Sequence, residues 1–533
     1  MGQIAYRANL SAATFPMTIA DGGRTVIVPG PDQNFDRRVD PEGSQRDAGI
    51  PQALYMENVM PTTNGYQSVG YKTLAALPVP GPTSGGLGPA VVRGSAYLYV
   101  ADAATGFVRR FLCLFRSQAS FSNRDIVASS FTTGIFAWTY ATGSMPFPVG
   151  EFLSSTRVRG ATYVYSDAKF YTVDNPGTDV LNFTDITGSI VGITTLSDVV
   201  CIWSCANYLM VVLKSGLVMW SSLLTITDFT SSLVNGAGQI FPNDLNLRVK
   251  FVKEASNGFY IYTESEVIYG QYTGNARYPF KFTPVKDSGG YDFAYQVFGE
   301  SRSSTQYAID STSNVRRIVG QQAELLASDV SNFLEKTKRA EELNYTTNLF
   351  SIGSVASTKK LTYLLDKYVI TKHTVGSNSY FMTFDLGLGR YGKLKVQGDV
   401  YTDLQSLYFF GTEEGSVGYQ LSFDIYDTDF PAASALLLGK FQYVRSRLMK
   451  LEEIEIEGPQ NTAIVSSPNF SCALLPSTDG RNFDAPIPLS PTRISGGLVE
   501  YHCHNTARNH SLLLKGAFSV STVQLKFVAA GDR

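Results

Sequence analysis

The chain has 533 residues, a length that predicts more than one domain. Hydrophobic residues make up 44% of it and charged residues only 17%, so a large core can be buried, and the 12% aromatic content favours strands. The net charge is −2 and long basic runs are absent, which argues against a protein that grips nucleic acid through a basic stripe.

The cysteines and the apolar runs predict the cellular compartment in which the protein is made. The cysteines are few, odd in number and scattered, which disfavours a disulfide framework and fits a reducing compartment. The first residues, MGQIAYRANLSAATF, lack a basic segment followed by an apolar one, so no signal peptide is expected. Without a long apolar run we also expect no membrane-spanning segment. We therefore expect synthesis and assembly in the cytoplasm.

The first part of the chain is polar and rich in turn-forming residues. Residues 1 to 50 carry many Gly, Pro, Asp and Arg residues and predict an extended arm or ordered loop without a helix. A second Pro/Gly stretch at 77–89 predicts an exposed loop or linker. We assign 1–75 to an N-terminal arm with strands that close the following domain.

Short strands separated by turns dominate from about residue 90 to residue 320. Asn257-Gly258 is a strong hairpin signal, because both residues accept positive φ. Hairpins follow one another without helices, which favours antiparallel sheets over alternating strands and helices. The apolar runs that predict these strands lie at 97–100, 161–165, 169–173, 208–213, 217–220, 249–252 and 259–263.

A succession of hairpins is typical of a β-propeller, in which each blade is a small antiparallel sheet. No clean repeat is visible, so we expect a degenerate β-propeller over 76–400, closed by strands from both ends of the chain. Residues 321–345 contain good helix formers, and Ser328 or Asp329 could cap a helix, so we expect a small helical insertion there.

The C-terminal part predicts a second β domain. Residues 453–457, EIEIE, alternate strictly between apolar and charged side chains, as in a strand with one face on a core. Further strands are expected near 470–475, 498–503 and 511–527, with polar loops between them. The fold class is therefore mainly β, with a C-terminal β-sandwich over 401–533.

The strongest candidate for metal binding lies in this second domain. If the segment Glu500-Tyr-His-Cys-His504 is a strand, Glu500, His502 and His504 project from one face. Two histidines and a glutamate could bind zinc. A solvent-exposed strand face explains the same pattern more simply, and we expect no metal there.

Other candidate sites have simple structural explanations. Cys201 and Cys205 lack partners at zinc spacing and are interpreted as small buried residues. The segment from Ser477 to Phe483 is close to the Asp-box of sialidase propellers, but it is one residue short and occurs once, so an Asp-Gly turn explains it. A further group of carboxylates lacks the glycine and glutamate of a calcium-binding loop and predicts a solvated loop; it comprises Asp424, Asp427 and Asp429.

Nothing in the sequence matches a catalytic or nucleotide-binding motif. The chain has no phosphate-binding loop, no dinucleotide fingerprint and no G-x-S-x-G in a strand–turn–helix context. Its four histidines offer little material for general acid–base catalysis. We expect no enzyme, no catalytic residue and no cofactor.

Several segments carry a resemblance to a known family. Residues 53–73 contain Asn58 and Pro61 at a chain reversal, and Gly65 leading into a strand. Residues 217–238 contain a strand that ends in Trp220-Ser221, then a loop, then Asp228-Phe229-Thr230. Further matching segments lie at 258–272, at 508–518 and at 384–396, the last of which includes Gly389, Arg390 and Gly392.

Taken in order along the chain, these segments resemble the tail nozzle proteins of short-tailed bacteriophages (podoviruses). This family includes tail tubular protein B-like and packaged-DNA stabilisation proteins. The resemblance implies a propeller, a homohexameric ring in the virion tail, and a place below the portal-adaptor. Implied partners are further copies, the head-to-tail connector, tail fibre, tailspike or tail-tip proteins, and double-stranded DNA that passes without tight binding. Implied roles are retention of the packaged genome and guidance of its ejection.

Local physical arguments accompany this resemblance. Asp228 is placed to bond nearby backbone N–H groups, Phe229 to fill the core of a blade, and Trp220 to be buried at its strand end. The alternative function is a glycan-binding or glycan-cleaving propeller for host recognition, which needs exposed aromatic residues beside carboxylates. The chain has few tryptophans for that purpose, namely Trp138, Trp203 and Trp220. A third alternative, an outer-membrane barrel, is disfavoured by the scarcity of regular ten-residue alternations.

Overall fold

The structure is a computed structural model of the chain. The residues that it describes are 3–9, 24–29, 52–62, 65–76, 91–117, 124–130, 138–140, 154–166, 168–176, 180–242, 248–275, 278–299, 303–312, 314–327, 343–344, 349–350, 359–365, 368–375, 378–386, 391–396, 399–402, 407–410, 417–422, 430–431, 434–441, 448–458, 470–478, 483–520 and 522–529.

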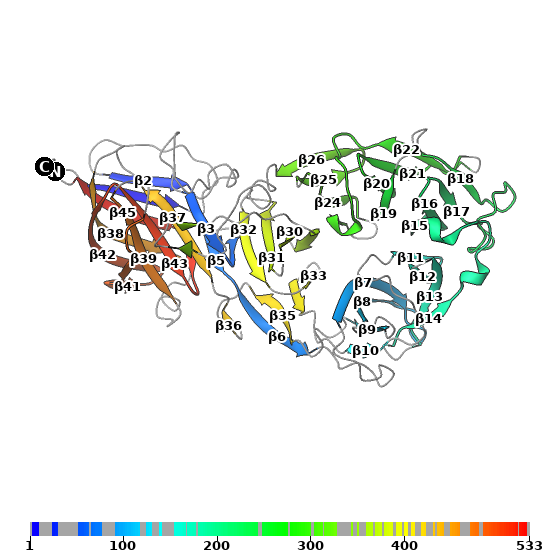
Figure 1. Ribbon diagram of the computed structural model, residues 1–533, viewed down its shortest axis with the longest axis horizontal. Coiled ribbons are helices and arrows are strands. Elements are labelled where there is room, and N and C mark those ends of the chain that lie inside the picture. The colour runs from blue at the N-terminus through cyan, green and yellow to red at the C-terminus, as the bar shows by residue number, and fades with distance from the viewer. Residues whose placement is uncertain are drawn as a thin grey trace.

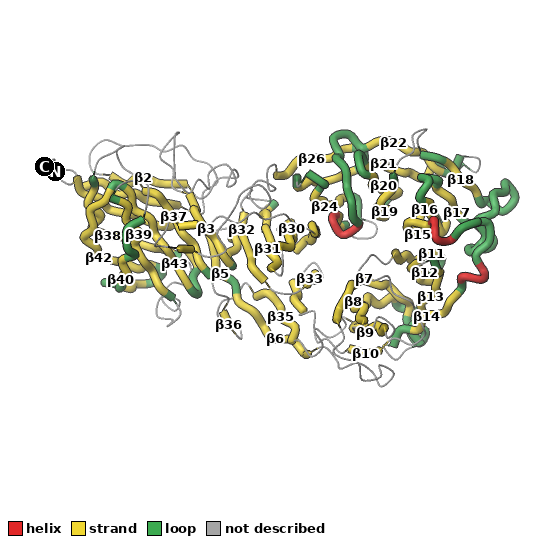
Figure 2. The backbone as a smooth tube through the Cα atoms, in the orientation of Figure 1, coloured by secondary structure: helices red, strands yellow, loops and turns green. Residues whose placement is uncertain are grey.

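Strands form nearly all of the described structure. They build a ring of sheets and, beside it, a pair of stacked sheets (Figures 1 and 2). Helix is confined, in these residues, to the single-turn elements η1 (Thr187–Ser189), η2 (Leu196–Asp198) and η3 (Ala294–Gln296). The predicted mainly β fold class is confirmed.

Four-stranded antiparallel sheets follow one another along the chain. The first contains β7 (Val91–Ala101), β8 (Val108–Ser117), β9 (Arg124–Ser130) and β10 (Trp138–Tyr140). The second contains β11 (Ser154–Val158), β12 (Ala161–Ser166), β13 (Lys169–Asp174) and β14 (Asn182–Asp185). The third contains β15 (Val199–Cys205), β16 (Tyr208–Leu213), β17 (Val218–Trp220) and β18 (Gly238–Ile240).

The series continues with two more sheets of the same design. The fourth contains β19 (Val249–Ala255), β20 (Gly258–Thr263), β21 (Val267–Tyr272) and β22 (Phe280–Pro284). The fifth contains β23 (Val297–Phe298), β24 (Thr305–Ile309), β25 (Val315–Val319) and β26 (Gln322–Ala327). The hairpins predicted between residues 90 and 320 are therefore confirmed.

These sheets are the blades of a β-propeller. The first strands of neighbouring sheets lie beside one another around the centre, as β7, β11, β15 and β19 do, and the last strands lie at the rim (Figure 1). Packing between blades buries large aromatic side chains. For example, the rings of Trp203 and Phe259, from the third and fourth sheets, have centroids 5.1 Å apart. This arrangement explains the aromatic-rich strands.

Two further sheets combine strands from distant parts of the chain. One contains β29 (Lys359–Leu365), β30 (Tyr368–Val375), β31 (Asn378–Asp385), β32 (Tyr391–Val396), β4 (Val59–Thr62), β5 (Gly65–Ser68) and β44 (Ser519–Val520). The other contains β33 (Asp399–Thr402), β34 (Leu407–Phe410), β35 (Val417–Ser422), β6 (Gly70–Ala76) and β36 (Phe430–Pro431). The beginning of the chain thus supplies strands to both sheets, and its end supplies β44 to the first, so sequence from both ends contributes to closure as predicted.

The remaining sheets form the C-terminal sandwich. One sheet has the order β2 (Arg24–Pro29), β1 (Gln3–Asn9), β45 (Thr522–Ala529), β38 (Met449–Glu457), β42 (Leu498–Ala507) and β41 (Arg493–Ser495). The other has the order β3 (Gln52–Glu57), β37 (Ala435–Phe441), β43 (Asn509–Lys515), β39 (Ser471–Ser477) and β40 (Ile487–Leu489). A separate pair joins β27 (Leu343–Asn344) to β28 (Leu349–Phe350).

The strand pairing refines the boundaries between the domains of the chain. The N-terminal arm supplies β1, β2 and β3 to the sandwich, whereas β33 to β36 pair with one another or with β6. The C-terminal strands of the sandwich therefore begin at β37, later than the division expected at residue 401. The predicted alternation at 453–457 is confirmed, because Ile454 and Ile456 are buried between partly exposed glutamates.

The predicted helical insertion is corrected in its first part. Residues 322–327 form strand β26, which pairs with β25 through a tight turn after Val319. Gly320 takes a φ of 58° in that turn, a left-handed conformation that glycine adopts at no steric cost. The hairpin outweighs the helix propensity of this segment, since cross-strand pairing overrides a weak local preference. Ser328 and Asp329 lie outside the described residues, as does the linker expected at 77–89.

Candidate functional site

The Trp-Ser pair of the family-like segment lies at the end of β17. Trp220 is 8% exposed, and its ring meets that of Phe280 edge-on at a centroid distance of 5.3 Å. Its Nε1–H donates to the carbonyl of Gly236 at 2.9 Å. Buried Ser221 accepts the N–H of Leu209 on its Oγ at 3.0 Å and donates its own N–H to the Leu209 carbonyl at 2.8 Å. The predicted burial of Trp220 is confirmed.

Asp228 organises the loop of residues 221–237 that joins β17 to β18. Its Oδ1 accepts the N–H of Thr230 at 2.8 Å, and its Oδ2 accepts Nδ2–H of Asn235 at 3.2 Å. The bonds from Thr230, and then that from Asn235, hold the pKa of this carboxyl below its usual value. Phe229 is 1% exposed in the core between the second and third sheets. The local predictions for Asp228 and Phe229 are therefore confirmed.

The tips of the same loop carry apolar side chains that are exposed to solvent. Leu224 is 78% exposed, Leu233 is 83% exposed and Val234 is 91% exposed. Beneath them, the Oγ of Ser222 accepts the N–H of Leu224 at 2.9 Å and donates to the carbonyl of Asn235 at 3.1 Å. A hydrogen-bonded base thus holds exposed aliphatic side chains in a fixed arrangement.

The exposed apolar surface continues onto the neighbouring sheet. The rings of Tyr208 and Tyr272 have centroids 6.4 Å apart, and Tyr278 is 62% exposed in the turn between β21 and β22. Contiguous exposed apolar side chains on a soluble protein mark interaction surfaces. We call this group the apolar tip surface, and it comprises Leu223, Leu224, Leu233, Val234, Tyr272 and Tyr278.

Ion pairs occur at both faces of the propeller. In an antiparallel four-stranded blade, the turns between the first two and the last two strands lie on one face, and the middle turn lies on the other. The apolar tip surface belongs to the first face, where Arg109 also pairs with Asp102 at 2.7 Å in the β7–β8 turn. Further ion pairs lie at the second face, and they join Lys169 to Asp185 at 3.3 Å, Lys214 to Asp198 at 4.0 Å, Lys250 to Glu264 at 2.7 Å and Arg316 to Asp310 at 2.7 Å.

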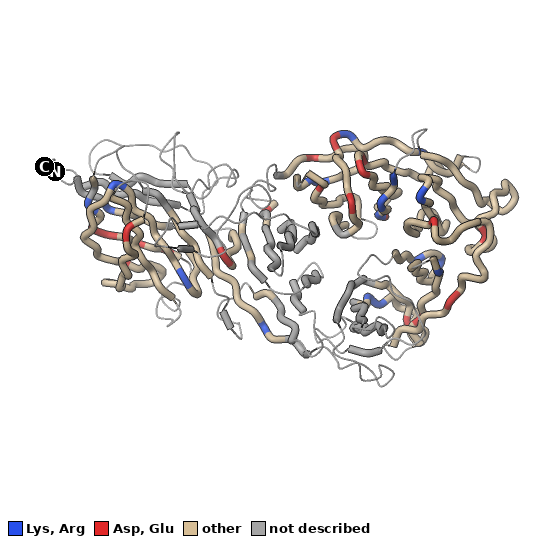
Figure 3. Tube along the Cα trace, viewed as in Figure 1, with Lys and Arg blue, Asp and Glu red and all other residues tan. Residues whose placement is uncertain are grey.

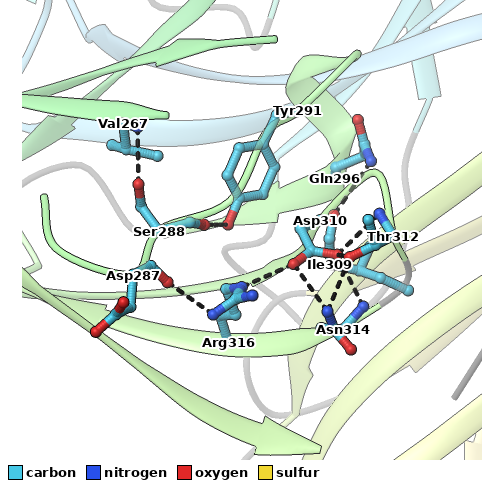
Figure 4. A network of polar contacts seen from close by, with 10 residues as sticks. All are labelled: Val267, Asp287, Ser288, Tyr291, Gln296, Ile309, Asp310, Thr312, Asn314 and Arg316. Atoms are coloured by element: carbon cyan, nitrogen blue, oxygen red, sulfur yellow. Dashed lines mark hydrogen bonds and ion pairs between the residues drawn. The ribbon is translucent and has the colours of Figure 1, made fainter. Parts of the chain in front are cut away.

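One of these pairs is part of a buried polar network in the fifth sheet (Figure 4). Asp310 is 1% exposed and accepts the N–H groups of Thr312 at 3.0 Å and Asn314 at 2.9 Å on one oxygen. Its other oxygen accepts Nε–H of Arg316, whose guanidinium also donates to the carbonyl of Asp287 at 2.7 Å. The network ties the β24–β25 turn to the segment after β22, so a structural role accounts for the buried charge.

Polar side chains also connect the inner strands of neighbouring blades. Ser154 of β11 donates its Oγ–H to the carbonyl of Ile202 at 2.9 Å and accepts the N–H of the same residue at 2.8 Å. The carboxylate of Glu254, on β19, accepts the N–H of Ser204 at 2.9 Å and the hydroxyl of Thr156. β15 is the first strand of its sheet, so the backbone groups on its inner edge face no further strand of that sheet. The side chains of Ser154 and Glu254 supply hydrogen-bond partners to these groups.

The family-like positions of the N-terminal strands lie at the closure of the propeller. Strand β32 pairs with β4 through Lys393 and Val59. A methyl group placed on Gly392 would lie 2.6 Å from the Val59 carbonyl oxygen, 2.7 Å from Cδ of Pro61 and 2.5 Å from Oγ1 of Thr383. Pro61 and Gly392 are distant in the sequence but lie in contact here. The space at position 392 is too small for any side chain, so only glycine fits there.

Asn58 is the single residue between β3 and β4, and the chain reversal lies further on, between β4 and β5, where Thr62 pairs with Gly65. Asn58 has a φ of 53°, a left-handed conformation that asparagine tolerates better than most residues. Its carbonyl accepts the N–H of Val69 at 3.2 Å and the hydroxyl of Ser434 at 3.0 Å. Gly65 begins β5. The other two family-like positions, Gly389 and Arg390, lie outside the described residues.

The predicted exposed strand face in the sandwich is confirmed. On β42, His502 and His504 are exposed, whereas Tyr501 and Cys503 point to the core. The structure adds a residue that the sequence did not single out, because Glu453 of β38 lies directly opposite His502. One potential ligand atom from each of Glu453, Glu500 and His502 lies within 4.8 Å of the others, and His504 is not part of this group.

Basic residues on the flanking strands contact these carboxylates. Lys526 Nζ lies 2.9 Å from Oε2 of Glu453, and NH1 of Arg493 lies 3.3 Å from Oε1 of Glu500. Burial, followed by the charges of neighbouring glutamates, raises the pKa of Glu455 on the same face. Negative charge therefore accumulates here in spite of the two ion pairs.

The cysteines are all free. Cys201 is buried and Cys205 is partly buried, as expected for small core residues. Burial raises the pKa of each of these two thiols to about 12, so both stay protonated at neutral pH. Protonated thiols are poor nucleophiles, which agrees with a structural role.

The remaining sequence candidates are only partly described. Asp424, Asp427 and Asp429 lie outside the described residues, and so do Asp479 and Gly480. At the edge of that turn, Thr478 donates its N–H to Oδ2 of Asp484 at 3.0 Å, and Phe483 is buried. None of the helices in the described ranges is long and apolar enough to cross a membrane.

No protein-family model matches the sequence, and no curated protein matches it. Among solved structures, the computationally designed Ika8 protein is 10% identical, with 65% of this chain and 99% of that chain covered and a TM-score of 0.33. BamB from Moraxella catarrhalis is 9% identical, with coverages of 70% and 97% and a TM-score of 0.31. BBS1N, solved in complex with ARL6DN, is 9% identical, with coverages of 62% and 92% and a TM-score of 0.33.

Proposed function

We propose that this chain is a structural virion protein that forms a ring in the tail of a short-tailed bacteriophage. In this proposal the ring is homohexameric and serves as the nozzle below the portal-adaptor. It retains the packaged genome and guides its ejection into the host. Its partners are further copies of the chain, the head-to-tail connector, and the fibre, tailspike or tail-tip proteins.

The main support for the proposal is the structure of the loop of residues 221–237, which lies in the family-like segment. The residues that carry the resemblance form the base of this loop. Trp220, Ser221 and Phe229 are buried, and Asp228 is partly buried. The same loop presents most of the apolar tip surface. A hydrogen-bonded scaffold beneath an exposed apolar surface suits a protein that functions by assembly, since burial of that surface would stabilise contacts between subunits.

The ring contacts in this proposal are head-to-tail. One surface of a copy meets a different surface of the next copy, and rotation closes the ring. The propeller flanks, including the apolar tip surface, and the sandwich supply these contacts. The apolar tip surface and the sandwich are unlike surfaces of one copy, as such contacts require.

The charge distribution supports a passage through which DNA slides. Basic and acidic residues are interspersed over the described propeller and sandwich (Figure 3). A basic lining would hold DNA through counterion release, because duplex DNA carries about one negative charge per 1.7 Å. A mixed surface avoids this, so the isolated chain should show no measurable affinity for DNA at physiological salt.

The assembly is tested on the purified full-length chain by native mass spectrometry and electron microscopy. We expect closed rings of a single size from the wild-type chain. The variant Leu224→Ser, Leu233→Ser, Val234→Ser should dissociate into smaller species, because its changes lie at side chains that are 78–91% exposed and leave the fold intact. Phe241→Ser, at a 56% exposed residue that follows β18 on the other face, is the matched control and should leave the rings unchanged.

Two outcomes would contradict the proposal. Monomers of the wild-type chain at high concentration would exclude a ring of copies. Release of sugar from host-surface glycans would favour the alternative glycan-cleaving propeller. That alternative requires exposed aromatic residues. The apolar tip surface offers Tyr272 and Tyr278 for this, whereas Trp203 and Trp220 are 1% and 8% exposed, respectively.

A further inference from the structure

The face of the sandwich that carries His502 brings together ligand types that transition metals prefer. Glu453 of β38 is paired directly with His502 of β42, and Glu500 lies on the same face of β42. One carboxylate oxygen of each glutamate and one imidazole nitrogen lie within 4.8 Å of one another. This group combines residues of two strands, so sheet register, and not sequence spacing, creates it.

The backbone that carries these side chains is held from the other face of the sheet. Ile454, Tyr501 and Cys503, which alternate with them, are 0%, 1% and 8% exposed. Buried neighbours on both strands fix the positions of the three Cα atoms. Only rotation of the partly exposed side chains is left to bring the ligand atoms closer.

The required movement is a rotation of side chains. Zinc lies about 2.0–2.2 Å from nitrogen and oxygen ligands, so two ligand atoms of one tetrahedral ion are about 3.3–3.6 Å apart. The ligand atoms here lie within 4.8 Å of one another, so they must approach by about 1 Å. Imidazole nitrogen combined with carboxylate oxygen is a ligand set that suits zinc.

Each ion pair at this site involves one oxygen of a glutamate, and the other oxygen can bind a cation. Lys526 contacts Oε2 of Glu453, and Arg493 contacts Oε1 of Glu500, so each carboxylate keeps a second oxygen. In the strand order β45-β38-β42-β41, both basic residues lie on the outer strands, and the three ligands lie between them. Carboxylates that bind a metal are commonly oriented by hydrogen bonds from residues that do not bind the metal themselves.

Charge on this face also favours a divalent ion. The carboxylates of Glu453 and Glu500 lie close to each other at this site, and the repulsion between them is relieved by a bound cation.

We infer that Glu453, Glu500 and His502 bind a divalent transition-metal ion, with zinc as the best match to the ligands. Three protein ligands leave a position for water, the arrangement of an open zinc site. This inference replaces the expectation of an unoccupied strand face. It goes beyond the proposed tail function and does not depend on it.

The test uses the full-length chain without a histidine tag. The protein is stripped with a chelator, dialysed against zinc ions at micromolar concentration, and analysed for bound zinc by elemental analysis. We expect one zinc per chain for the wild type. His502→Ala and Glu453→Gln should each weaken binding by more than about tenfold.

His504→Ala is the matched control, because it removes an exposed histidine of the same strand face that is not part of the ligand group. It should bind zinc as the wild type does. Circular dichroism of each variant confirms that the sandwich is folded. Absence of stoichiometric zinc in the wild type, or equal losses in His504→Ala and His502→Ala, would overturn the inference.

Discussion

Replacement of Trp220 by alanine tests the packing of the family-like segment. The indole is 8% exposed and packs edge-on against Phe280. A methyl group on Gly238 would lie only 2.4 Å from its Cζ2, so a residue without a side chain faces the ring. Because glycine cannot fill the space left by the indole, Trp220→Ala should lower the free energy of unfolding by about 3–5 kcal/mol, towards the upper part of that range.

A second variant separates packing from hydrogen bonding. Trp220→Phe keeps an aromatic ring but loses the bond from Nε1–H to the Gly236 carbonyl, which is 2.9 Å long. Leaving that partly buried carbonyl without its donor should cost about 1–3 kcal/mol. The stabilities are compared by urea denaturation of the full-length chain, followed by circular dichroism.

Leu224→Ala is the matched control for these variants. Its side chain is 78% exposed, so the stability should change by less than about 0.5 kcal/mol. Equal stabilities of Trp220→Ala and Leu224→Ala would show that the indole does not contribute to the core between the third and fourth sheets. The assignment of the motif loop to a rigid scaffold would then fail.

The remaining predictions concern the closure of the propeller and the loop carboxylate. Gly392→Ala should open the β32–β4 junction, because the new methyl group would lie within 2.7 Å of both Val59 and Pro61. Faster proteolysis of the N-terminal strands in this variant, but not in Gly188→Ala, where the added methyl group meets no heavy atom within 4 Å, would show this. The pKa of Asp228 is lowered in the folded state, so its contribution to stability is present above the unfolded pKa and is lost as pH falls through the folded pKa. Melting curves between about pH 2 and 5 should therefore fall more for the wild type than for Asp228→Asn, and parallel curves would contradict this.

Local patterns in the sequence predict the strands of the propeller well. Apolar runs and hairpin turns depend on neighbouring residues, so the strand at 208–213 and the hairpin around Asn257 follow from the sequence. The same holds for the burial of Trp220 and Phe229, since apolar residues at strand ends and after turns pack into a blade.

Features that depend on long-range register could not be predicted. Gly392 and Pro61 lie far apart in the sequence, and only the pairing of β32 with β4 brings them together. Glu453 joins His502 through the register of β38 and β42, which sequence spacing does not encode. The helix expected from 321 onward was wrong over 322–327, because the tight turn at Gly320 lets this segment pair with β25.

The central claim is that the chain forms the passage that holds and then releases the phage genome. The most direct measurement compares particles assembled with and without this protein, by DNA content and by infectivity on the host. The account predicts that particles without it lose their packaged DNA or fail to infect, and that supplying the protein restores both. Genome-filled, fully infectious particles that lack the protein would contradict it.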